Sequence, residues 1–149
     1  MKEQELNISN AEMVIMRVIW SLNGAKVEEV MRQISKRQNW SLATVKTLMG
    51  RLVKKEVLTT EKEGRAFVYR AAMSECDAIR QMTGELLEKI CATKESEFLS
   101  DAIDLAKLKQ SDIDNLIKQL QEKVATETVS CDCLDDNNCS CVHNQIISK

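Results

Sequence analysis

The sequence predicts a mainly α-helical protein that contains one small β-hairpin. Apolar residues recur at the three- and four-residue spacing of amphipathic helices in residues 9–55 and again from residue 74 onward. Between these stretches, residues 57–70 hold two short runs of strand-forming side chains separated by a glycine. We therefore expect a helical N-terminal domain that ends in a hairpin, followed by a helical C-terminal region.

The first two helices are indicated by capping signals and apolar spacing. Ser9 is expected to form a capping box with Glu12 at the start of the first helix. Asn23-Gly24 should end this helix, because these residue types tolerate a left-handed backbone. A second helix is expected over about residues 27–38.

The third helix is expected to begin after Ser41, its N-cap, and to carry a basic face opposite its apolar side. No carboxylate interrupts residues 41–55. Threonine and lysine bond phosphates, arginine bonds guanine bidentately, and small residues let a helix approach the major groove. A solvated helix face that happens to be basic is the alternative. The candidate DNA-binding residues, one of them on the hairpin, are Ser41, Ala43, Thr44, Lys46, Thr47, Arg51, Lys54 and Arg65.

The hairpin is expected to turn at residues 62–64, with Gly64 at the position that needs a positive φ. Three helices followed by a two-stranded ribbon is the order of a winged helix-turn-helix domain. In that arrangement the third helix would enter the major groove, and Arg65 on the hairpin would reach the DNA backbone or the minor groove.

The C-terminal region is expected to form a helical dimerisation arm. A Ser74–Asp77 capping pair should begin its first helix. Thr93 should cap the second helix, and Ser111 with Asp114 should begin the third. Helices of this length on so few residues cannot enclose a core alone. Their apolar sides should therefore pack against a partner subunit, which predicts a homodimer.

The charge is divided unequally along the chain. Residues 1–73 contain 13 Lys/Arg and 8 Asp/Glu, a net +5, whereas residues 74–149 contain 8 Lys/Arg and 15 Asp/Glu, a net −7. This asymmetry favours contact of the N-terminal half with phosphates and a different role for the C-terminal half. The alternative is that the unequal charge serves only solubility. We expect a winged-helix DNA-binding domain over residues 1–72, a helical dimerisation region over 73–126 and a cysteine-rich tail over 127–149.

Four of the six cysteines lie in the tail, in the run CDCLDDNNCSC. The N-terminus lacks a signal-peptide core and no apolar stretch approaches a membrane span, which predicts a cytoplasmic protein in a reducing compartment. A disulfide between positions i and i+2 would also be strained. Both points argue against a disulfide staple. The four candidate metal ligands are Cys131, Cys133, Cys139 and Cys141.

Thiolates are soft ligands that bind Zn(II) and Cu(I). Four thiolates around one ion make a closed, structural zinc site, whereas Cu(I) takes two or three thiolates per ion and can form a compact cluster. A thiol redox sensor and a metal-storage tail are the alternatives. Cys76 and Cys91 are expected to be small core residues, and His143 a solvated tail residue. A hydrolase or redox enzyme built on a Cys–His pair has no further support in the sequence, so we expect no enzymatic activity.

Three stretches resemble the BlaI/MecI family of winged-helix repressors over about the first 72 residues: AEMVIMRVIWSL, NWSLATVKTLMGRLVKKEVL and EKEGRAFVYRA. The resemblance implies that WSLATVKTL belongs to the recognition helix, that the hairpin is the wing, and that the C-terminal helices form the dimer. Two residues depart from the family pattern. Glu56 stands where a glycine is usual, which should strain the helix end, and Gly50 stands where some members have a larger polar residue. The family's DNA contacts correspond to Thr44, Lys46, Thr47, Arg51 and Arg65.

The paired Cys-x-Cys tail is similar to that of the CopY-type copper-responsive members of this family. That resemblance implies that the zinc-bound dimer binds a palindromic operator upstream of copper-export genes and leaves it when Cu(I) replaces zinc. A copper-donating chaperone is a partner compatible with this mechanism. Penicillin-responsive members lack such a tail and are inactivated by proteolysis. A zinc- or thiol-redox-controlled repressor of the same family remains the alternative.

Overall fold

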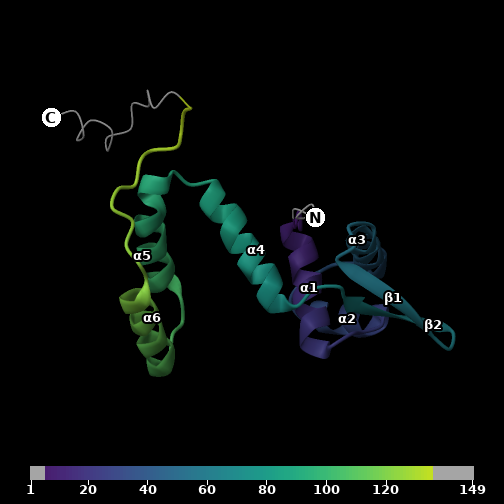
Figure 1. The fold of residues 1–149 in the computed structure, drawn as a ribbon. Helices are drawn as coiled ribbons and strands as arrows, with labels where there is room; N and C mark the ends of the chain where they lie inside the picture. Colours follow the sequence, from purple (N-terminus) through teal and green to yellow (C-terminus); the bar gives the residue numbers. More distant parts are fainter. Residues whose placement is uncertain (1–5, 136–149) are drawn as a thin grey trace. The chain divides into compact units, whose positions relative to one another are not determined.

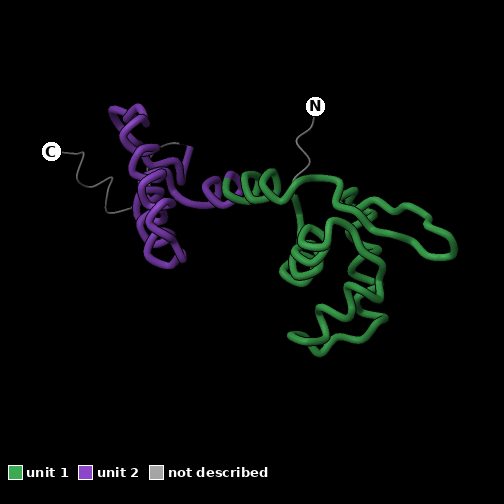
Figure 2. Tube along the Cα trace, turned by 90° about the horizontal axis from the view of Figure 1, so that it is seen from below, with its two compact units in different colours: residues 1–83 green, residues 84–149 purple. Residues whose placement is uncertain are grey.

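The computed structural model of the protein describes residues 6–135. It divides into two compact units, residues 1–83 and 84–149 (Figure 2). None of the helices within the described residues is long and apolar enough to cross a membrane.

The first unit contains three helices followed by a two-stranded antiparallel ribbon (Figure 1). A short bridge between Ala25 and Tyr69 adds the α1–α2 connection to the edge of this ribbon. This order and pairing are those of a winged-helix domain, as the sequence predicts. The elements are α1 (Asn10–Leu22), α2 (Val27–Ile34), α3 (Leu42–Lys54), β1 (Leu58–Glu63) and β2 (Ala66–Ala71).

The ends of α1 confirm the predicted capping signals. The Ser9 side chain accepts a hydrogen bond from the Glu12 backbone N–H at 3.2 Å, and the Glu12 carboxylate accepts one from the Ser9 N–H at 2.9 Å. At the other end Asn23 adopts a left-handed backbone with φ of 54°. The Gly24 N–H then donates to the Ile19 carbonyl at 3.1 Å. These bonds satisfy backbone groups that the helix itself leaves unpaired.

The core of the first unit fixes which side of α3 faces outward. Burying one Val, Leu, Ile or Met side chain contributes about 1.5–3 kcal/mol to the stability of the fold. Since the apolar side of α3 is inserted between α1, α2 and the hairpin, its opposite side remains in solvent. The largest fully buried side chains are Ile15, Met16, Ile19, Met49, Leu52, Leu58, Glu12, Val30 and Val45.

Two boundaries in this unit differ from the prediction. Helix α2 ends at Ile34 and not near residue 38, because the N–H groups of Arg37 and Gln38 both bond the Ile34 carbonyl and close a tight turn. The hairpin turn consists of Gly64 and Arg65 alone, since β1 continues through Glu63. Cross-strand pairing therefore overrides the weak strand propensity of Lys and Glu at the end of β1.

The second unit is helical, and helix α4 crosses the boundary between the two units. Ser74 caps α4 as predicted, because its hydroxyl accepts the Asp77 N–H at 3.1 Å. Ala78 of this helix is fully buried in the core of the first unit. The elements from here onward are α4 (Glu75–Glu88), the short 3₁₀ helix η1 (Ala92–Lys94), α5 (Glu95–Leu105) and α6 (Gln110–Glu122).

Two predicted caps in the second unit are wrong. Thr93 lies inside η1, and Lys94 is the residue that precedes α5. Ser111 lies in the first turn of α6, where Lys109 precedes the helix and its N–H donates to the Asp112 carboxylate at 3.2 Å. In both places another residue close in sequence supplies the helix start, which apolar spacing alone does not locate.

Candidate DNA-binding face and cysteine cluster

The candidate DNA-binding residues of α3 lie on one exposed side of the helix. Ser41 is the N-cap, and its hydroxyl accepts the Thr44 N–H at 3.1 Å. Residues at the intervening positions, Val45, Leu48, Met49 and Leu52, are buried, as the apolar spacing predicts. Leu42 has the spacing of this buried side but is 40% exposed, because it occupies the first position of the helix. The exposed candidates on this helix and its cap are Ser41, Ala43, Thr44, Lys46, Thr47, Arg51 and Lys54.

The cations of this face are available to phosphates. Within residues 6–135, no ion pair joins Lys46, Arg51, Lys54 or the turn residue Arg65 to a carboxylate. The threonine hydroxyls differ, since Thr47 already donates to the backbone at 2.9 Å. We therefore expect the basic side chains to supply most of the attraction for a nucleic acid.

A buried carboxylate attaches the end of α3 to the start of α1. Glu12 is 1% exposed, and its carboxylate lies 2.7 Å from the Lys55 ammonium group. Burial raises the pKa of Glu12, but the hydrogen bonds from Lys55 and from Ser9 outweigh it and hold the pKa below the ordinary value of 4.5. Lys55 also donates to the Asn7 carbonyl at 2.6 Å. Local sequence patterns do not predict this pair, because its partners are 43 residues apart.

The C-terminus of α3 is closed by two bonds of a Schellman motif. The Val57 N–H donates to the Leu52 carbonyl and the Glu56 N–H to the Val53 carbonyl, both at 3.0 Å. Glu56 itself has a φ of 60°. The prediction that this position is strained is confirmed, since a residue with a Cβ is held where glycine is preferred.

The second unit contains a cluster of three cysteine thiols. The Sγ atoms of Cys91, Cys131 and Cys133 all lie within 4.8 Å of one another, and those of Cys91 and Cys131 are 3.5 Å apart. Cys131 is 4% exposed and is the only buried residue among those described from residue 84 onward. Within the described part of this unit Cys131 is thus the most enclosed side chain, whereas Cys91 is half-buried and Cys133 is exposed.

Local bonds hold the two chain segments of the cluster together. The Asp132 carboxylate accepts the Ala92 N–H at 2.9 Å, across 40 residues of sequence. The Thr93 hydroxyl lies 3.1 Å from the Cys91 sulfur. This hydrogen bond is the largest cause that lowers the pKa of Cys91 to about 6, against the opposing effect of desolvation, with further contributions from Cys131 and Cys133. A lowered pKa favours the thiolate, which is the form that binds metals.

The three thiols suit a soft metal ion. A zinc–thiolate bond is about 2.3 Å long, so two sulfurs on one ion are at most about 4.6 Å apart. Sulfurs that already lie within 4.8 Å of one another need only small shifts to share an ion. Of the predicted ligands, Cys131 and Cys133 are brought together here, whereas Cys139, Cys141 and also His143 lie outside the described residues.

The expectation for the two remaining cysteines is wrong. Cys76 is exposed on α4 and is not a core residue. Cys91 is half-buried and belongs to the thiol cluster. No spacing rule could have found Cys91, because 40 residues separate it from Cys131 and only the fold of the second unit brings them together.

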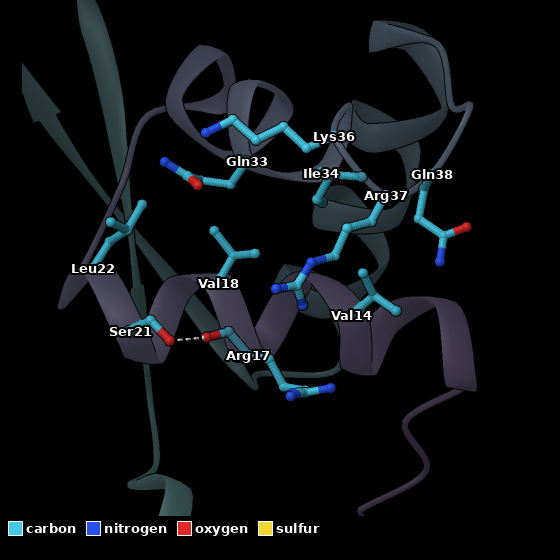
Figure 3. A pocket seen from close by; sticks show the side chains of 10 residues that line it. All are labelled: Val14, Arg17, Val18, Ser21, Leu22, Gln33, Ile34, Lys36, Arg37 and Gln38. Atoms are coloured by element: carbon cyan, nitrogen blue, oxygen red, sulfur yellow. Dashed lines mark hydrogen bonds between the residues drawn. The ribbon is translucent and has the colours of Figure 1, made fainter.

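A groove of about 520 Å³ lies between α1 and residues 33–38 of the first unit (Figure 3). Arg17, Lys36 and Arg37 make it cationic, and its lining contains no cysteine, histidine or carboxylate. It therefore offers no metal ligands, and no residue of α3 lines it.

The winged-helix fold is that of a DNA-binding domain, and a thiol cluster lies in a separate helical unit. The chain belongs to the penicillinase repressor (BlaI/MecI) family, whose model matches residues 8–122. The family resemblance seen in the sequence is thereby confirmed.

Relatives match over most of the chain. The penicillinase repressor of Bacillus licheniformis is 32% identical over 115 residues, covering 77% of this chain and 90% of that protein. An uncharacterized 16.5 kDa protein in the ptsI 3′ region of Latilactobacillus sakei is 41% identical over 143 residues, covering 95% and 97%. Among solved structures, the CopR repressor is 65% identical and covers 46% of this chain and all of that one, with a TM-score of 0.40.

Proposed function

We propose that this protein is a copper-responsive transcriptional repressor. In this proposal the zinc-bound dimer binds a palindromic operator of copper-transport genes and is released when its thiolates exchange zinc for Cu(I). The observation that carries the proposal is the cluster of Cys91, Cys131 and Cys133 in a chain of a repressor family. Binding of a soft metal ion explains why three thiols converge at one point of the fold.

The DNA-binding part of the proposal rests on α3. Its exposed face combines Lys46, Arg51 and Lys54 with small residues, and its opposite face is fixed in the core. In a dimer, two such helices would read two half-sites about one helical turn apart, which requires a palindromic operator. Arg65 at the hairpin turn would add a contact to the backbone or minor groove.

The homodimer is supported by exposed apolar side chains on the last two helices. Leu99 and Ile103 are spaced by four residues on α5 and are 48% and 47% exposed. Ile113, Ile117 and Leu120 form a similar row on α6, with 38%, 49% and 61% exposure. Such rows mark an interface, and a second copy of the chain is the partner expected for a palindrome-binding repressor.

The thiolates supply the response. Four thiolates close a tetrahedral zinc site, whereas Cu(I) takes fewer thiolates per ion, so the exchange changes which cysteines are held together. We place this chemistry in the cytoplasm, where thiols stay reduced and the operator is present. A copper-donating chaperone would deliver the ion, and we assign the protein no enzymatic activity.

The decisive experiment is fluorescence anisotropy of a labelled palindromic operator with zinc-loaded protein, titrated with Cu(I) under anaerobic reducing conditions. We expect DNA release together with the appearance of free zinc. DNA binding that ignores copper and is lost on oxidation would instead support the thiol-redox repressor, which the 3.5 Å approach of Cys91 and Cys131 also permits. As a control, the variant Cys76→Ser should keep the copper response of the unmutated protein, because Cys76 lies outside the cluster.

A further inference from the structure

We propose that Cys91 is a metal ligand, and that Cys91, Cys131 and Cys133 together form a three-thiolate site for Cu(I). The inference rests on the proposed metal-sensing function and goes beyond the paired Cys-x-Cys tail, because one ligand comes from the helical arm. Its basis is the mutual approach of the three sulfurs within 4.8 Å.

The geometry favours a site built before any ion arrives. Cys131 is buried at 4% exposure, and the Asp132 carboxylate holds the Ala92 N–H at 2.9 Å. This bond fixes the residue next to Cys91 to the residue between the two tail cysteines. Ligands whose positions are set by neighbouring hydrogen bonds bind metal more tightly than ligands that must be ordered on binding.

Three thiolates are a complete set for Cu(I), whereas zinc requires a fourth ligand. The described residues therefore supply enough ligands for one Cu(I) ion without Cys139 or Cys141. For zinc, at least one further ligand would have to join the three sulfurs. The same cluster thus distinguishes the two ions by the number of cysteines that each recruits.

Ligation at Cys91 would also connect the tail to the DNA-binding domain along the chain. Cys91 follows α4, which ends at Glu88, and α4 contributes the buried Ala78 to the core of the first unit. A metal bound to Cys91, Cys131 and Cys133 therefore acts on a segment that is continuous with the winged helix.

The test uses the full chain with Cys139→Ser and Cys141→Ser, which leaves the three clustered thiols and Cys76. We expect this protein to bind one equivalent of Cu(I) with three sulfurs, as measured by X-ray absorption and by competition with a copper chelator. Adding Cys91→Ser should weaken Cu(I) binding at least tenfold and leave two sulfurs, since even loss of a supporting residue costs about 10–100-fold in metal affinity. Adding Cys76→Ser instead is the matched control and should change neither quantity.

In this titration two outcomes would overturn the proposal: equal Cu(I) affinity in the Cys91→Ser and Cys76→Ser backgrounds, or no Cu(I) bound by the protein that lacks only Cys139 and Cys141. A second measurement needs no substitution. Iodoacetamide should alkylate Cys76 with and without Cu(I), but Cys91 only in the metal-free protein, as read by mass spectrometry. Equal alkylation of Cys91 in both states would contradict its role as a ligand.

These results are separable from those of the proposed function. If three sulfurs bind Cu(I) but operator binding ignores copper, the function fails and the site stands. If copper releases the operator equally well in the unmutated protein and in Cys91→Ser, with unchanged Cu(I) affinity, the function stands and the role of Cys91 is lost. A Cys91–Cys131 disulfide in protein isolated without added oxidant, with metal affinity unaffected by Cys91→Ser, would overturn the inference as well.

Discussion

Glu56 is a single residue whose backbone conformation works against the stability of helix α3. It has a φ of 60° at the position that follows the helix C-cap, where a left-handed conformation costs a residue with a Cβ about 1–2 kcal/mol. The Schellman bonds to Leu52 and Val53 still form. Other contacts of the helix end therefore compensate for the strain.

Replacing Glu56 with glycine should stabilise the protein. We expect Glu56→Gly to raise the free energy of unfolding by about 1 kcal/mol, because glycine adopts this backbone without the Cβ clash. Urea denaturation of the two proteins measures the difference. The control is Glu56→Ala, which removes the same charge but keeps the Cβ and should bring no comparable gain. A similar gain from alanine would show that the carboxylate, and not the backbone, is unfavourable.

Glu12 gives the molecule a predictable acid sensitivity. Its folded-state pKa is below the ordinary value of 4.5, so the folded protein holds the charged form more tightly than the unfolded chain does. The stability from this group is fully present above pH 4.5 and is lost as the pH falls through the lowered pKa.

We expect Glu12→Gln to lose about 1–2 kcal/mol at neutral pH, since a hydrogen bond to a charged group contributes about 1.5–3 kcal/mol and Lys55 is partly exposed, which screens the pair. Below the lowered pKa the variant and the parent should have nearly equal stability. Urea denaturation at a series of pH values measures both effects. Glu28→Gln, at an exposed position on α2, serves as the control, and an equal loss there would remove the Lys55 pair as the cause.

At the scale of elements, α3 is the part that the sequence predicts best. Its N-cap Ser41 and its four buried positions follow from spacing and capping rules alone. The C-terminus of α2 and the N-terminus of α5 are less predictable, because a tight turn sets the first and the 3₁₀ helix η1 sets the second. Contacts between distant segments, such as Glu12 with Lys55, were not predictable at all. Only the folded chain brings such residues together.

The α3 face should be responsible for operator binding. We expect Lys46→Ala to weaken DNA binding at all sequences and to reduce the salt dependence by about one counterion, as for a phosphate contact. Arg51→Ala should cost about 1–3 kcal/mol in discrimination between bases if it bonds guanine. Anisotropy titrations at several salt concentrations measure both. Lys36→Ala removes the same charge from the groove beside α1 and should have a smaller effect. Equal losses for Lys36 and Lys46 would assign binding to net charge alone.

The apolar row on α6 should hold the dimer together. Introducing a charge by Ile117→Glu should weaken dimerisation at least tenfold, because burial of such a side chain contributes about 1.5–3 kcal/mol. Sedimentation equilibrium measures the change. Asn115→Glu adds the same charge about 200° away around the helix, by the 100° that each residue turns. A dimer that tolerates glutamate at position 117 would show that another surface makes the interface.

At the scale of the whole molecule, the two units were predictable to different extents. The winged helix has its own core, and its pattern could be read from local sequence. The second unit has almost no core among its described residues, so its packing depends on contacts that no local pattern reveals. The thiol cluster is the clearest example. The sequence predicts Cys91 as a core residue, whereas the fold of the second unit brings its sulfur close to that of Cys131.

The thin interior of the second unit has a consequence for the cellular lifetime of the protein. Cys131 is the only buried residue described there, so a lone subunit holds this unit together with little hydrophobic burial. In the proposed dimer, its folding would be linked by mass action to the concentration of the partner chain. Newly made or diluted subunits would be the ones that proteases recognise and degrade. We expect the amount of repressor in a cell to influence its own rate of turnover, with sparse subunits removed faster than abundant ones.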